Sequence, residues 1–285
     1  CGWGEMPWLD TLCITFGSAG TGGFAVLNDG CASYSPYIRT VTTVFMTLFG
    51  VNFSVYFFLL CRKFKLAWNN SEVRWYFIII FSAVALITLN LMHVGDFFPT
   101  VGQAIHHVFF SVSSVITTTG YGTVDFARWP DFSKVILGML MIIGACAGST
   151  GGGIKTTTIF VLAQEIRCIF SKQRPGAFRR ALPANAIAKA STIGLLGMLV
   201  VCCTTFLLCI LEPGLPFISL LFEAVSAYST AGLSTGITAQ LCLAAKLVLI
   251  FTMYTGRVGA FTLLSLWVER PEPNAHFTEE AITIG

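Results

Sequence analysis

The chain has 285 residues, of which 55% are hydrophobic and only 11% are charged. Soluble domains carry a larger charged fraction, so this composition excludes an ordinary water-soluble fold and indicates a protein whose main solvent is lipid. The formal net charge is only +3, and the ten cysteines include no C-x-x-C pair, so neither a zinc site nor a disulfide framework is expected.

Five apolar windows are long enough to cross a hydrocarbon layer, which takes about 20 predominantly apolar residues of helix. The windows are residues 40–61, 75–95, 135–154, 190–211 and 246–268. Asp, Glu, Lys and Arg are absent from the first four, and the last contains only Lys246 at its first position and Arg257 within it. We therefore expect an all-α membrane protein.

Basic residues crowd two connections between these windows. The clusters are Arg62, Lys63, Lys65 and Arg74, and Arg167, Lys172, Arg174, Arg179, Arg180 and Lys189. The positive-inside rule places both on the cytoplasmic side of the cell membrane. A nucleic-acid-binding patch is less consistent with the pattern, because each cluster directly flanks a spanning window.

The stretch between the second and third windows, residues 96–134, must then begin and end outside the cell. Its middle, residues 103–124, contains no acid, lysine or arginine and is too apolar for open water. A short helix that enters the membrane and returns as extended chain fits better, because non-helical backbone at that depth is tolerated where it is buried or lines a watery cavity. Similar stretches precede the first window and the last one.

Ungapped alignment of the three stretches reveals a repeated motif of threonine, a small or hydroxyl residue, glycine and a large apolar residue. Its copies are Thr21, Gly22, Gly23 and Phe24; Thr118, Thr119, Gly120 and Tyr121; and Thr230, Ala231, Gly232 and Leu233. Four positions before each threonine stands a small residue, Gly17, Ser114 or Ser226. Such an internal repeat is a strong organisational signal. It predicts helix, pore loop, helix units arranged pseudo-symmetrically around a central pore.

The repeat divides the chain into successive segments. They are a pore loop and second helix, interpreted as belonging to a second repeat, over 1–61; a cytoplasmic connection over 62–73; a third repeat with a broken second helix over 74–166; a basic cytoplasmic connection over 167–189; a fourth repeat over 190–268; and a tail over 269–285. A pore lined by extended loops needs a closed ring, so we interpret the chain as a fragment preceded by about one and a half further units.

The motif suits a dehydrated cation. Residues 118–122 read TTGYG, close to the TVGYG filter of potassium channels, in which backbone carbonyls replace the hydration shell of K+. Glycine permits the dihedral angles that point carbonyls inward, and the preceding short helix directs the negative end of its dipole toward the ion. Helix packing by small residues would explain one copy of the motif but not three at matching positions.

These motifs resemble the Trk/Ktr/HKT superfamily of cation transporters, in particular pore-forming subunits of the TrkH/KtrB type. The resemblance covers essentially the whole chain and implies potassium uptake across the cytoplasmic membrane, a homodimer, and a cytosolic nucleotide-binding ring of the TrkA/KtrA type. It implies K+ as the transported ion and no organic cofactor or nucleic acid. In that family, glycine at the position of Gly23, Gly120 and Gly232 accompanies potassium preference. A sodium-permeable member of the same fold remains the alternative.

A glycine-rich segment interrupts the window 135–154. Four glycines within six residues break a helix, and a phosphate-binding P-loop is excluded because Ile154 separates Gly153 from Lys155 and no strand precedes the segment. The resemblance implies a flexible intramembrane gate below the filter. The candidate gate residues are Gly148, Ser149, Thr150, Gly151, Gly152, Gly153 and Lys155.

Arg257 is a second gate candidate. A lone arginine within an apolar span usually faces a bundle interior or a water-filled cavity, and about ten apolar residues on either side disfavour snorkelling to the lipid headgroups. The resemblance implies an electrostatic barrier to cations at this position. An intramembrane enzyme is disfavoured because neither H-E-x-x-H nor G-x-S-x-G occurs.

Five further polar residues stand out in or beside the apolar segments. His93, His106 and His107 could suggest a metal or proton relay, although packing at the interface is expected for His106 and His107. Asp10 and Glu223 fall in the predicted pore helices, and we expect them to hydrogen-bond the filter backbone from behind.

Overall fold

The computed structural model describes residues 5–27, 29–65, 70–95, 97–171, 176–177, 180–181, 184–260 and 262. Over these residues the chain is helical, apart from a short antiparallel ladder between β1 (Gly176–Ala177) and β2 (Arg180–Ala181). The predicted all-α architecture is confirmed. The tail 269–285 and much of the basic connection 167–189 lie outside the described residues.

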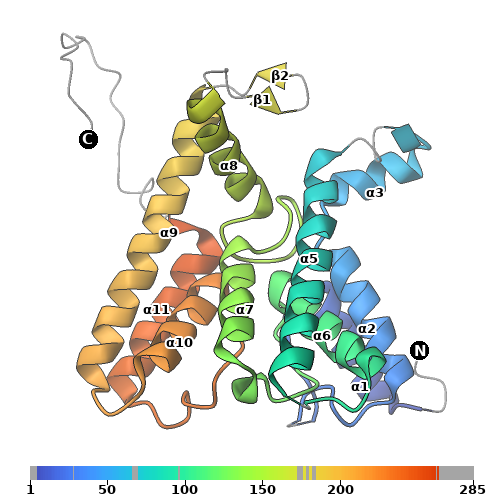
Figure 1. The fold of residues 1–285 in the computed structure, drawn as a ribbon, viewed down its shortest axis with the longest axis vertical. Helices are drawn as coiled ribbons and strands as arrows, with labels where there is room; N and C mark the ends of the chain where they lie inside the picture. Colours follow the sequence, from blue (N-terminus) through green and yellow to red (C-terminus); the bar gives the residue numbers. More distant parts are fainter. Residues whose placement is uncertain are drawn as a thin grey trace.

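The helices form three groups in chain order (Figure 1). The first group contains α1 (Trp8–Ala19), α2 (Pro36–Phe49) and α3 (Phe53–Leu60). The second contains α5 (Ser71–Val94), α6 (Val101–Ile116), the short 3-10 turn η1 (Phe126–Arg128), α7 (Asp131–Ile143) and α8 (Thr156–Ser171). The third contains α9 (Ala184–Leu211), α10 (Phe217–Ser229) and α11 (Leu243–Val258). Packing of α2 on α6 and of α7 on α10 joins neighbouring groups.

Two helices of the described chain, Glu72–Val94 and Ile187–Leu211, are long and apolar enough to cross a membrane. They correspond to the predicted windows 75–95 and 190–211. By contrast, α6 and α10 are apolar but short, and their carboxyl-terminal halves are buried in the protein. The short helices therefore end inside the bundle, as expected of pore helices.

The expectation of one continuous helix over 40–61 is wrong. The chain bends by 92° between α2 and α3, where Gly50 ends α2 and the Asn52 side chain accepts a hydrogen bond from the Ser54 N–H at the start of α3. Gly50 O also accepts from the Cys146 N–H, and the Phe53 N–H donates to Gly148 O, both at 3.1 Å. The backbone groups freed by the break are thus paired with the glycine-rich segment.

The windows 135–154 and 246–268 also differ from simple spans. Helix α7 ends at Gly144, where φ is +66°, and α8 begins only at Thr156, so the intervening backbone is non-helical. Helix α11 is interrupted at Gly259, where φ is +91°, and the described residues Ala260 and Thr262 after it are again helical. Glycine in the left-handed conformation explains both breaks.

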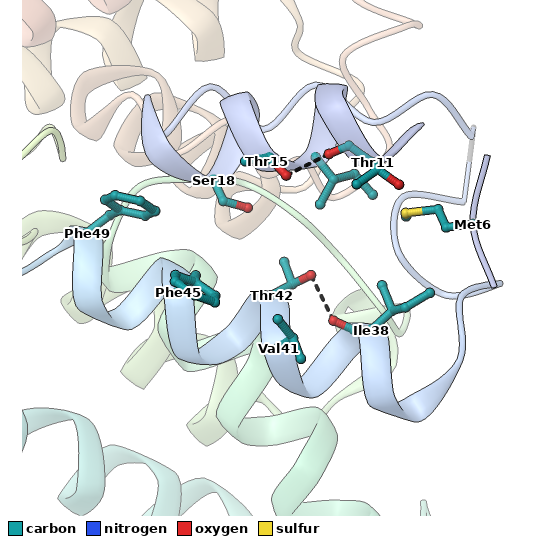
Figure 2. Close-up of a pocket in the computed structure, with 10 residues that line it drawn as sticks. Met6, Thr11, Thr15, Ser18, Ile38, Val41, Thr42, Phe45 and Phe49 are labelled. Carbon is teal, nitrogen blue, oxygen red and sulfur yellow. Dashed lines mark hydrogen bonds between the residues drawn. The ribbon is translucent and has the colours of Figure 1, made fainter. Parts of the chain in front are cut away.

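An apolar groove of about 280 Å³ lies between α1 and α2 (Figure 2). It is lined by Met6, Thr11, Ile14, Thr15, Ser18, Ile38, Val41, Thr42, Phe45 and Phe49. In the other groups a long helix packs against both the pore helix and the helix after it: α5 against α6 and α7, and α9 against α10 and α11. Within the described part of the chain, no long helix packs in this way against α1 and α2.

Candidate functional site

The three Thr-x-Gly motifs adopt the same backbone conformation. Each threonine lies in the left-handed region, with φ of 51° at Thr21, 55° at Thr118 and 56° at Thr230. Each glycine two residues later also has positive φ, namely 69° at Gly23, 87° at Gly120 and 75° at Gly232. β-Branched residues rarely adopt positive φ, so three threonines in this conformation mark a backbone held in place by its surroundings.

One hydrogen bond, repeated in every motif, ties the segment to its preceding helix. The N–H after the threonine donates to the carbonyl of the small residue four positions before that threonine. The pairs are Gly22 to Gly17 at 2.8 Å, Thr119 to Ser114 at 2.9 Å and Ala231 to Ser226 at 3.0 Å. The carboxyl ends of α1, α6 and α10 therefore lead directly into the predicted filter segments.

The motif glycines bring the three segments together. A Cβ atom added at Gly23 would collide with Thr119 O and stand 3.5 Å from the Gly120 Cα; one added at Gly120 would collide with Ala231 O and stand 3.6 Å from the Gly232 Cα. Only glycine permits this approach of backbone to backbone. At Gly232 an added Cβ meets no described atom within 4 Å, so among the described residues no further backbone segment packs against this glycine.

The large apolar residues of the motifs differ in their environments. Tyr121 is buried, and its hydroxyl donates to Phe24 O at 3.4 Å, in the space left by the absent side chain of Gly17. Phe24 is largely exposed, and Leu233 is partly buried. Tyr121 therefore joins the first and second motifs through its side-chain hydroxyl.

The glycine-rich segment lies against all three motif threonines. Thr21 Oγ1 donates to Thr150 O at 3.0 Å, and the Gly152 N–H donates to Thr118 Oγ1 at 2.7 Å. The Cα of Gly152 also approaches Thr230 so closely that a Cβ there would collide with Thr230 Oγ1. The predicted gate and the predicted filter are thus in direct contact.

A cavity of about 460 Å³ opens on the other side of this segment. It is lined by residues 149–155 together with Ile193, Tyr228, Gly256, Arg257, Val258, Gly259, Ala260 and Thr262. Among the described residues, Lys155 and Arg257 supply its charges, and no carboxylate of that part of the chain lines it. The Lys155 ammonium donates to Gly151 O, whereas the ion pairs of the described residues do not include Arg257. Two predicted gate residues from separate elements therefore share one cavity.

A family model described as "TrkH: Cation transport protein" matches residues 3–276. The chain belongs to this family. Its named relatives include the Trk system potassium uptake protein TrkH of Salmonella typhimurium, 31% identical over 276 residues that cover 92% of this chain and 56% of that protein. The Ktr system potassium uptake protein B of Bacillus subtilis is 28% identical over 92% of this chain and 60% of its own length.

The fold agrees with a solved member of the TrkH family. The crystal structure of the potassium transporter TrkH from Vibrio parahaemolyticus superposes with a TM-score of 0.81 at 26% identity, covering 93% of this chain and 59% of that one. The chain spans between 56% and 60% of these three proteins. The relatives are named as uptake proteins, which agrees with the interpretation that this TrkH-family chain is not an enzyme.

Glu72 is a structural support of this TrkH-family site that the sequence patterns did not indicate. Its Oε1 accepts from the Ala147 N–H at 2.6 Å, and its Oε2 accepts from the Asn52 side chain at 3.2 Å. Glu72 thus fixes one end of the glycine-rich segment to the bend between α2 and α3. In the sequence, Glu72 is recognisable only as an acidic residue in the first turn of a spanning helix. That position indicates a favourable interaction with the helix dipole and nothing about the glycine-rich segment.

Glu223 and Asp10, both buried, take different partners. Glu223 accepts from the Thr235 N–H and the Thr238 hydroxyl, each at 3.0 Å, and from the Ser234 hydroxyl, so it holds the backbone just after the third motif. Asp10 instead accepts from the Tyr34 hydroxyl at 2.9 Å. Glu223 therefore binds backbone two residues after the third motif rather than the motif itself, and Asp10 binds a side chain, so the expected contact with the filter backbone is found for neither residue.

The histidines also differ from one another. His93 is exposed, whereas His106 and His107 contact α2 through Thr40 and Arg39. No group of three or more His, Cys, Asp or Glu residues suited to a metal occurs among the described residues.

Proposed function

We propose that the protein forms the ion-conducting part of a potassium-uptake system in the cytoplasmic membrane. The observation that carries this proposal is the direct apposition of Gly23, Gly120 and Gly232 in three motifs with the same left-handed backbone. Segments from distant parts of the chain that meet backbone to backbone offer carbonyl oxygens around one axis. Carbonyl oxygens arranged in this way can take the place of the hydration shell of K+.

Threonine hydroxyls add to this set of oxygens. Among the described residues, Thr230 Oγ1 is buried without a hydrogen-bond partner, and Thr118 Oγ1 accepts a backbone N–H from the glycine-rich segment. A buried hydroxyl that lacks a partner is costly unless another group binds it. An unpaired buried oxygen at the end of the filter therefore supports a cation as the missing partner.

The gate in this proposal is formed by residues 148–155 and Arg257. The segment covers the threonine end of all three motifs, and the cavity behind it carries the charges of Lys155 and Arg257. A positive charge on the ion path opposes a passing cation. Flux then requires the segment to move, and its glycines permit that movement.

Orientation and partners follow from the same proposal. By the positive-inside rule, the basic clusters favour a cytoplasmic location for the connection after α3 and for the connection between α8 and α9. The carboxyl ends of α5, at Val94, and of α9, at Leu211, then lie toward the outside of the cell. The likeness to TrkH and Ktr proteins supports a homodimer gated by a cytosolic nucleotide-binding ring of the TrkA/KtrA type.

A sodium-permeable transporter of the same fold is the second candidate. Enterococcus hirae has a relative named potassium/sodium uptake protein NtpJ, 29% identical over 100% of this chain and 65% of that protein. Flux measured with Na+ as the sole external cation separates the two candidates, since a potassium-selective filter would pass little of it.

The test is K+ flux into liposomes containing the full-length protein, with Gly23→Ala and Gly102→Ala as matched variants. At Gly23 the added methyl collides with Thr119 O in a left-handed backbone, whereas at Gly102, in α6, it meets nothing within 4 Å. We expect Gly23→Ala to lose flux by on the order of tenfold or more, because strain of this kind costs about 1–3 kcal/mol. Equal flux in the two variants would exclude the apposed motifs as the conduction path.

A further inference from the structure

A histidine on the first half of α6 is joined to the outer end of the second filter motif. His107 Nδ1 lies 3.1 Å from Thr123 Oγ1, and Thr123 directly follows the TTGYG sequence. The preceding carbonyl, Gly122 O, accepts from the Cys31 N–H at 2.9 Å. His107 and Cys31 thus hold this end of the motif from two sides.

The opposite ring nitrogen of His107 faces a permanent cation. Arg39 Nη1 of α2 lies 3.5 Å from His107 Nε2, and the Arg39 Nε is buried without a partner. A guanidinium can only donate hydrogen bonds, so Nε2 must present its lone pair to Arg39. Nδ1 then carries the hydrogen and donates it to Thr123. The two contacts together require the neutral ring with one defined tautomer.

Protonation of Nε2 would place an N–H and a positive charge against the Arg39 guanidinium. Both groups would then be donors, so this contact would be lost and the ring or the arginine would have to move. Because the same ring holds Thr123, its movement would release the outer end of the motif. The additional charge would also oppose cation entry.

Few other charged or titratable groups of the described residues lie near His107. His106, on the same helix, is in edge contact with His107 and adds repulsion. On the helices packed against α6, the titratable groups near the outer end are the exposed His93 of α5 and, on α7, Asp131 and Lys134, which pair with each other. No carboxylate of the described residues is hydrogen-bonded to His107 that could stabilise its protonated form.

We propose that His107 is a proton-binding positioning residue, which holds the second filter motif through Thr123 while neutral and releases it when a proton enters from outside the cell. This inference rests on the proposed function. Burial, followed by the Arg39 charge, lowers the pKa of His107, so the neutral ring prevails at neutral pH. Lowering the external pH through that pKa should decrease K+ flux.

The test is K+ flux into liposomes at a fixed internal pH while the external pH is lowered from about 8 to about 5, a range in which histidines titrate. For the wild-type full-length protein we expect flux to fall several-fold. In His107→Asn, whose amide can still donate to Thr123 but cannot gain a proton, flux should vary by less than about twofold over that range. The control His93→Asn removes an exposed histidine outside this network and should retain the wild-type profile.

Arg39→Met provides a second measurement, because it removes the donor that the protonated ring cannot tolerate. The protonated ring of this variant can still donate to Thr123, so its flux should fall less with external pH than that of the wild type. A wild-type profile in His107→Asn, or a wild-type profile in Arg39→Met if His107→Asn does not fold, would overturn the inference. Flux that is present but independent of pH in the wild type would also overturn it. Absence of K+ flux at every pH would instead overturn the proposed function, and the inference with it.

Discussion

At Gly120 two constraints act on one residue. The backbone has φ of +87°, and the space in which a side chain would stand is occupied by Ala231 O. The same pair of constraints applies at Gly23. Residues of this kind are recognisable in the sequence only through the repeat, because an isolated Thr-x-Gly is common in turns.

We expect Gly120→Ser to weaken discrimination between K+ and Na+. The new side chain would displace Ala231 O from its present place, and selection by carbonyl geometry depends on such positions. The K+/Na+ flux ratio should fall by on the order of tenfold, corresponding to about 1.4 kcal/mol. Gly102→Ser is the matched control, since it lies on α6 outside the motif, without positive φ and with no described atom within 4 Å of its added Cβ. An unchanged ratio in Gly120→Ser would remove this glycine from the selectivity mechanism.

For other residues of the site, the sequence does not predict the contact that makes the residue necessary. Gly17 is needed because the Tyr121 hydroxyl occupies the place of its side chain, and His107 matters because Arg39 lies beside it. Each depends on a contact between residues far apart in the chain. Composition and spacing contain no information on such contacts, so the sequence indicated only interfacial packing for His107.

At the scale of elements, hydropathy predicted the continuous helices α5 and α9 but failed where helices break. Window 40–61 is apolar throughout, yet the chain turns by 92° within it. The broken backbone is stabilised by partners on the glycine-rich segment, Cys146 and Gly148. A hydropathy window measures only the transfer of side chains into lipid, and so it cannot detect where backbone groups find partners.

The glycine-rich segment should become more mobile when Glu72, which binds one end of it, is removed. In Glu72→Ala the partly buried Ala147 N–H loses its acceptor, which costs at most the roughly 1–3 kcal/mol of a fully buried unpaired N–H. We expect the variant to leak, with basal K+ flux raised several-fold and thermal stability lowered. Asp131→Ala is the control, because it removes an acid whose surface pair with Lys134 contributes little. Basal flux equal to that of the control would indicate that Glu72 does not restrain the segment.

For the molecule as a whole, the internal repeat predicted which segments lie together. The carboxyl ends of α1, α6 and α10 meet through their motifs, and the segment between α7 and α8 covers all three. The cavity behind that segment could not be delimited from the sequence, because its wall combines residues of α9, α10 and α11 with the glycine-rich segment. The resemblance implied that Arg257 lies near the gate, and the structure adds that Lys155 shares its cavity.

Removal of the charge at Arg257 should therefore increase K+ flux. On the proposed ion path, the two positive charges of this cavity would raise the energy of a passing cation, and a barrier lowered by about 1.4 kcal/mol raises a rate tenfold. We expect Arg257→Gln to conduct on the order of tenfold faster and Arg257→Lys to remain close to the wild type, as measured by K+ flux into liposomes. Lys246→Gln, near the other end of α11, removes a charge outside this cavity and should leave flux unchanged. If Arg257→Gln and Lys246→Gln conduct alike, the charge at 257 is no barrier, and closure must depend on the glycine-rich segment, including Lys155.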